Sequence, residues 1–103
     1  MTTFPIVNIN GDSVETLIGQ QWAVLRAAQE LRNKLSQAAP HGRNYQTQPI
    51  GATTAAREEW LATMVAAKAI EDQASATVND LMRQAHQRMS SQQVGEMTMR
   101  VMR

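Results

Sequence analysis

The stretch Ala-Pro-His-Gly-Arg-Asn-Tyr-Gln-Thr-Gln-Pro-Ile-Gly at residues 39–51 decides the fold, because two long helical patterns end against it from opposite sides. It contains two of the three prolines, two of the five glycines and the only tyrosine of the 103-residue chain. Proline and glycine both end helices. The sequence therefore predicts a loop over 39–52 between two helices, within a single domain that spans 1–103.

The first helical pattern precedes this loop. Its apolar residues recur at spacings of three and four, which is typical of an amphipathic helix. They are Val14, Leu17, Ile18, Val24, Leu25, Ala28, Leu31, Leu35 and Ala38. The pattern predicts a helix over 13–38, with Asp12 as its N-cap and Glu15 completing a capping box.

The second helical pattern follows the loop and predicts a helix over 53–89, capped by Thr53 or Thr54. Its apolar stripe consists of Trp60, Leu61, Met64, Ala67, Ala74, Val78, Leu81, Ala85 and Met89. Glu71 falls on the seam of this stripe. Two interpretations stay open: the carboxylate pairs with Arg26 or Arg32, or it lies at the edge of the seam in contact with water.

The two ends of the chain predict extended structure. Residues 3–9 are rich in apolar and β-branched side chains, and over 96–102 the residues Met97, Met99 and Val101 alternate with polar ones. We therefore predict a mainly α fold, a long antiparallel helical hairpin whose ends pair as a short two-stranded β-ribbon, within one chain or between two. The alternative for the tail is a frayed, partly helical segment.

The predicted helices differ in length. At ~1.5 Å per residue the second exceeds the first by roughly 16 Å, so part of its apolar face has no partner in the hairpin. This surplus face predicts an interface with another copy of the chain, and hence a homo-oligomer. The predicted interface residues are Val78, Leu81, Met82, Ala85 and Met89.

Composition argues against several classes of protein. A net charge of +1 gives no strong field for nucleic acid or for a membrane surface. The chain has no cysteine, which fits a cytosolic protein. We find no signal peptide, no membrane-spanning run and no catalytic motif, and His41 and His86 have no metal-ligand spacing. The sequence thus predicts neither an enzyme nor a cofactor nor a metal site.

The loop concentrates groups that recognise small anions. Arg43 carries a planar fork suited to phosphate, Tyr45 offers a face for stacking, and Gly42 allows backbone N–H groups to point at a ligand. The predicted ligand-binding residues are His41, Gly42, Arg43, Asn44, Tyr45, Gln46 and Thr47. The competing interpretation is structural: Arg43 caps the first helix, and Tyr45 closes the end of the bundle.

The order of these features resembles a family. An Asn10-Gly11 turn, a capped helix, the segment Pro-His-Gly-Arg-Asn-Tyr at 40–45 and a second long helix are similar to small helical-hairpin proteins of tailed phages and prophages. Their loop is often Pro-x-Gly-Arg-Asp-Tyr, and the likeness covers residues 8 to about 70. This chain has Asn44 where an acid is common, and one tyrosine where a pair is common.

The resemblance implies a phage-encoded protein in the cytoplasm of a bacterial host. Some small helical phage proteins are oligomeric sponges for the nucleotide signals of bacterial immunity. By analogy with them, we expect a non-enzymatic protein that sequesters a small anionic or nucleotide ligand. The alternative is a phage structural or inhibitor protein that acts through protein contacts of its helices.

Overall fold

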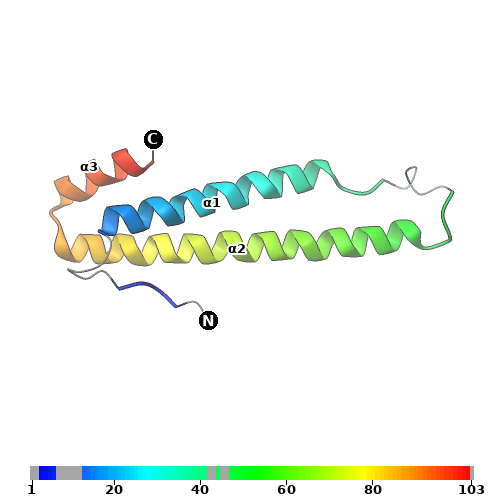
Figure 1. The fold of residues 1–103 in the computed structure, drawn as a ribbon, viewed down its shortest axis with the longest axis horizontal. Coiled ribbons are helices and arrows are strands. Elements are labelled where there is room, and N and C mark those ends of the chain that lie inside the picture. The colour runs from blue at the N-terminus through cyan, green and yellow to red at the C-terminus, as the bar shows by residue number, and fades with distance from the viewer. Residues whose placement is uncertain (1–2, 7–12, 42–43, 45–46, 103) are drawn as a thin grey trace.

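A computed structural model of the chain describes residues 3–6, 13–41, 44 and 47–102. The described residues form three helices and no strand: α1 (Val14–Gln37), α2 (Ala52–Arg88) and α3 (Ser91–Val101). α1 and α2 run antiparallel as a long hairpin (Figure 1). Their bounds agree within two residues with the predicted 13–38 and 53–89. The mainly α class and the extended hairpin are therefore confirmed.

α1 begins one residue later than its predicted cap implies. Its N-cap is Ser13, whose Oγ accepts a hydrogen bond from the backbone N–H of Thr16 at 3.2 Å. Asp12, the predicted cap, lies outside the described residues. Glu15 does not form a capping box with Ser13, because it is the second helical residue and the third, where a capping box needs its acid or amide, is Thr16. The Glu15 carboxylate is paired with Arg100.

α2 begins without a side-chain cap. Its N-cap is Gly51, at φ 95°, a left-handed conformation that glycine adopts without a steric penalty. Thr53 and Thr54, predicted as caps, lie inside the first turn. The helix continues unbroken to Arg88, and the Thr77 hydroxyl bonds to the carbonyl one turn back, at 2.9 Å.

The tail is helical, so the predicted extended segment over 96–102 is wrong. Ser90 and Gln93 form a reciprocal capping box that starts α3. Val94, Met97 and Val101 recur at helical spacing and face the core, whereas Met99 is 68% exposed. Three alternating apolar residues were too short a window to tell a strand from a helix. The described part of the chain contains no terminal β-ribbon.

α3 folds back over the end of the hairpin where α1 begins and α2 ends (Figure 1). All three helices contribute to the buried core there. Its members are Ile18, Val78, Leu81, Ala85, Val94 and Met97.

This core corrects the predicted interface. Val78, Leu81 and Ala85 are buried inside the chain, and Met82 and Met89 pack against the same cluster. The surplus face of α2 is thus covered by the chain's own third helix, which the prediction of an extended tail had excluded.

The N-terminal segment lies on the side of α2 away from α3 (Figure 1). The buried Gln84 amide of α2 donates to the Pro5 carbonyl at 3.0 Å and to Asp80 Oδ2 at 2.9 Å. One polar side chain therefore holds residues 3–6 against the hairpin.

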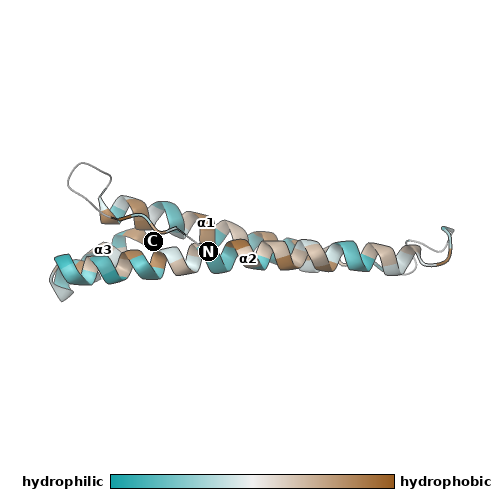
Figure 2. Cartoon of the chain, turned by 90° about the horizontal axis from the view of Figure 1, so that it is seen from below, coloured by the Kyte–Doolittle hydropathy of each residue, from teal (hydrophilic) through white to brown (hydrophobic). Residues whose placement is uncertain are grey.

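The middle of the hairpin has a thin interior. Its buried apolar residues are Leu25 and three alanines, Ala28, Ala67 and Ala74, which allow close approach but bury little surface. The resulting rod measures 62 × 28 × 19 Å, with a radius of gyration of 19.4 Å, against about 13 Å for a compact domain of this length. Figure 2 shows apolar residues recurring along the whole rod.

An ion pair crosses this interior. Arg32 Nη1 donates to Glu71 Oε2, and the Glu71 carboxylate is mostly buried. The interpretation that Glu71 pairs with an arginine across the hairpin is confirmed, with Arg32 as the partner, whereas the placement of Glu71 at a wet edge is wrong.

Candidate functional site

The predicted ligand loop lies at the end of the hairpin farthest from α3 (Figure 1). Three of its seven predicted residues are described: His41, Asn44 and Thr47 are all exposed. The backbone N–H of Asn44 donates to the His41 carbonyl at 3.0 Å, which forms a short turn. The other four predicted residues lie outside the described residues. They are Gly42, Arg43, Tyr45 and Gln46.

A hollow of about 300 Å³ adjoins this loop. The first loop residues, Ala39 and Pro40, form one wall, and three residues of α2 form the other: Arg57, Trp60 and Leu61. Residues three and four positions apart lie on one side of a helix. The spacing of the α2 residues therefore brings a guanidinium, an indole ring and an aliphatic side chain to the same hollow.

Trp60 is held by a hydrogen bond to α1. Its Nε1–H donates to the Leu35 carbonyl at 2.7 Å, one of the last carbonyls of α1, which also accepts from the N–H of Ala38. The indole therefore helps to cap α1. Because this bond fixes the polar edge of the ring, the indole stays in one orientation beside the hollow.

Arg57 supplies the positive charge of the hollow. Its side chain is exposed and makes no ion pair with any residue that the structure describes. Glu58 and Glu59 are its neighbours in sequence, but consecutive helical residues point to different sides. The planar guanidinium is thus available to an oxyanion such as a phosphate or a carboxylate, to which it donates two parallel hydrogen bonds.

Sequence reasoning missed the α2 side of this site. Trp60 was assigned to the core, and Arg57 was not singled out. The spacing Arg57-x-x-Trp60-Leu61, directly after a loop already predicted to bind anions, is the signal that could have found them. This spacing was overlooked because Trp60 also fits the apolar stripe of the helix. Its hydrogen bond to the Leu35 carbonyl shows that Trp60 does contact α1.

Two other hollows are less suited to a ligand. One, of about 570 Å³, is lined by α1 alone and is the outward surface of that helix. Another, of about 410 Å³, lies between α1 and α2 beside Arg32 and Glu71, whose charges already neutralise each other. The loop-end hollow differs from the first because the loop and α2 both line it, and from the second because its guanidinium has no carboxylate partner among the described residues.

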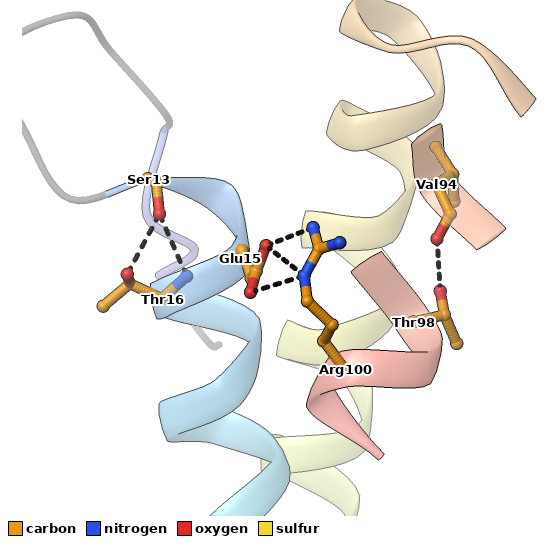
Figure 3. A network of polar contacts seen from close by, with 6 residues as sticks. All are labelled: Ser13, Glu15, Thr16, Val94, Thr98 and Arg100. Atoms are coloured by element: carbon orange, nitrogen blue, oxygen red, sulfur yellow. Dashed lines mark hydrogen bonds and ion pairs between the residues drawn. The ribbon is translucent and has the colours of Figure 1, made fainter. Parts of the chain in front are cut away.

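Paired charges at the opposite end of the hairpin have a structural role. Figure 3 shows Glu15 of α1 and Arg100 of α3 pointing toward each other. Hydrogen bonds from Arg100, aided by its charge, hold the pKa of Glu15 below its ordinary value, and the same contact raises the pKa of Arg100. These bonds tie the tail to the hairpin, far from the loop.

Asp80 is a second carboxylate with a lowered pKa. Its main cause is the hydrogen bond from Gln84, followed by the hydrogen bond and charge of Arg83. Because Gln84 also binds Pro5, this carboxylate helps to position the N-terminal segment.

In the described ranges, no group of three or more His, Cys, Asp or Glu side chains is placed to hold a metal ion. Within those ranges, no helix combines the length and the apolar character needed to cross a membrane.

Comparisons with family models, with curated proteins and with solved structures find no match to this chain. The chemistry of the loop-end hollow therefore has to be inferred from its own residues.

Proposed function

We propose that this protein is a non-enzymatic binding protein that captures a small anionic ligand bearing a planar ring at the loop end of its hairpin. One observation carries the proposal: Arg57 lines the same hollow as Trp60 and Pro40 without an ion-pair partner among the described residues. Nucleotides combine the two features that such a hollow recognises, a phosphate and a flat base.

Each residue has a distinct role in this proposal. The Arg57 guanidinium binds the phosphate through charge-assisted hydrogen bonds. The base stacks on the Trp60 indole, with Pro40 as the facing wall. His41, Asn44 and Thr47, the described members of the predicted loop site, follow Pro40 in the chain and supply exposed polar groups to the proposed site.

The resemblance to phage helical-hairpin proteins narrows the ligand class. A phage-encoded protein acts in the cytoplasm of its bacterial host, where cyclic nucleotides serve as immune signals. Sequestering such a signal requires only tight binding, so the proposed role needs no catalytic group.

The test is binding by calorimetry to a panel of cyclic dinucleotides and mononucleotides. Arg57→Ala should weaken binding of the responding nucleotide at least tenfold, about 1.4 kcal/mol or more, and Arg57→Lys should restore it only in part. Arg26→Ala is the matched control, because Arg26 is also exposed and unpaired in the described part of the chain but lies on α1. No heat of binding from any panel member to the wild-type protein would reject the proposal for this class.

A second candidate function has its own support. Leu61 and Val65 are exposed on α2, and apolar residues exposed one turn apart are typical of helices that dock on other proteins. A structural or inhibitor protein acting through these contacts would retain its partner when Arg57 is replaced and lose it with Val65→Glu. A nucleotide-binding protein instead loses its ligand when Arg57 is replaced and retains it in Val65→Glu.

A further inference from the structure

Two large apolar side chains in the middle of the hairpin are half exposed. Leu31 of α1 is 46% exposed and Ile70 of α2 is 49% exposed. Each directly precedes one member of the ion pair between Arg32 and Glu71. Leu31 and Ile70 are therefore at the same level along the rod.

They also lie on the same side of the hairpin. Arg32 and Glu71 meet across the gap between the helices. Leu31 and Ile70, one residue earlier on their helices, each point about 100° away from the paired side chain around the helix axis. Because α1 and α2 run in opposite directions and face each other, both rotations lead to the same side. We call it the Leu31–Ile70 side.

Between 17 and 31 on α1 and between 63 and 77 on α2, the Leu31–Ile70 side is uncharged and combines apolar with neutral polar residues. Spacings of three and four extend it along both helices. The row on α1 is Leu17, Gln20, Val24, Ala27 and Leu31, and the row on α2 is Thr63, Ala66, Ile70, Gln73 and Thr77. The opposite side carries charges, including Arg26 and Lys68. Depletion of charge is the compositional signal of an interface core, and small residues allow helices to approach closely.

The structure also limits the extent of this side. The α2 row continues from Thr77 to Gln84, seven positions further, where the amide binds Pro5. The N-terminal segment therefore covers that end. The row is exposed from Thr63 to Gln73 and becomes buried at Thr77. α3 contacts the hairpin through Glu15, on the other side of α1.

We infer that a second copy of this chain packs along the Leu31–Ile70 side, so that two hairpins form a four-helix dimer. A two-fold contact brings a surface against itself. An uncharged surface meets this condition without placing like charges together, whereas the opposite side would bring Arg26 and Lys68 near their own copies.

The solvent-exposed surface area of the chain also supports a second copy as the partner on this side. The chain exposes 7359 Å², whereas a folded monomer of 11.4 kDa exposes about 5,800 Å². The excess is about 1,600 Å², and a stable interface removes about 800 Å² from each partner. One neighbouring copy along this side thus accounts for about half of the excess.

The test is the mass of the full-length protein in solution, measured by sedimentation equilibrium from 1 to 100 µM. We expect twice the 11.4 kDa chain mass. Leu31→Glu and Ile70→Glu should each raise the dimer dissociation constant at least a hundredfold, because each buries an unpaired carboxylate in the interface. The control is Val65→Glu, which replaces a side chain that is 69% exposed on the outward face of α2 and should leave the mass unchanged.

Circular dichroism checks that every variant keeps the helical content of the wild type. Where a charged variant fails this check, Leu31→Gln or Ile70→Gln replaces it, with a smaller shift in the same direction. A wild-type monomer at 100 µM overturns the inference, as does dissociation by Val65→Glu alone. The mass readout requires no nucleotide, so its failure leaves the proposed binding function untouched.

Discussion

Glu15 and Arg100 are 85 positions apart in the sequence, yet Arg100 Nη2 lies 2.7 Å from Glu15 Oε1. Arg100 Nε also donates to both carboxylate oxygens, at 3.3 and 3.2 Å. The pair joins the first turn of α1 to the last turn of α3 (Figure 3). It thus fastens the tail over the core at the point where α3 itself ends.

This pair makes the docking of α3 sensitive to acid. The pKa of Glu15 is lowered in the folded protein, so its stabilising contribution is complete above the ordinary glutamate range and is lost as the pH falls through the lowered pKa. Arg100 stays charged across this range, because its pKa is raised. The protection of the α3 amides, measured by NMR as the exchange rate relative to the intrinsic rate at each pH, should therefore fall in acid.

A titration of the Glu15 carboxyl by NMR provides the direct check. Arg100→Gln should return the pKa of Glu15 toward its ordinary value and make the protection of the α3 amides less dependent on pH. Arg88→Gln is the control, since Arg88 forms no ion pair in the described part of the chain. An unchanged Glu15 titration in Arg100→Gln would contradict the assignment.

Replacing Leu81 tests whether this residue belongs to the core of the chain or to an interface. It is completely buried among α1, α2 and α3. Leu81→Ala should therefore lower the free energy of unfolding by about 2–5 kcal/mol, from lost burial and the cavity left behind. Leu61→Ala, an exposed leucine of the same helix, should change it by less than about 0.5 kcal/mol. Urea denaturation measures both, and equal effects would be inconsistent with the packing of α3.

The C-terminal tail is the part of the fold that was predicted wrongly from the sequence. The stripes of α1 and α2 are long enough to fix the period of each helix, so the hairpin was predictable. α3 has only eleven residues, and Met97, Met99 and Val101 fit a period of two by chance. The Ser90–Gln93 capping box was visible in the sequence and would have favoured the helix. Because this capping box was missed, Leu81 was predicted to lie at an interface and not in the core.

The candidate site was predictable only on its loop side. Composition alone identified the segment from His41 to Thr47, because prolines, glycines and polar groups are concentrated there. The contribution of Arg57 depends on how the loop returns to α2, which a helical pattern does not specify. The pairing of Arg32 with Glu71 was one of two open interpretations, because periodicity fixes a side chain's angle only to within about a quarter turn.

The ion pair between Arg32 and Glu71 matters to stability mainly because each partly buried charge needs the other as its partner. Glu71→Leu leaves Arg32 partly buried without a partner and should cost about 1–2 kcal/mol, less than for a fully buried pair because the Arg32 side chain remains partly exposed. The double variant Arg32→Leu/Glu71→Leu should recover most of this loss. Thermal unfolding of Glu71→Leu, Arg32→Leu and the double variant measures the coupling, and strictly additive losses would show that the pair contributes nothing.

Trp60 connects the fold to the proposed binding function, so two substitutions there separate its roles. Trp60→Phe removes the hydrogen bond to the Leu35 carbonyl and should lower the free energy of unfolding by about 1 kcal/mol. It retains an aromatic face beside Arg57, so nucleotide affinity should fall only severalfold. Trp60→Leu loses the hydrogen bond and the aromatic face together, and should bind at least tenfold more weakly than Trp60→Phe. Denaturation curves give the first quantity and calorimetry gives the second. Equal affinities of the two variants would show that the indole only caps α1, and that the ligand contacts at this end of the hairpin do not include stacking.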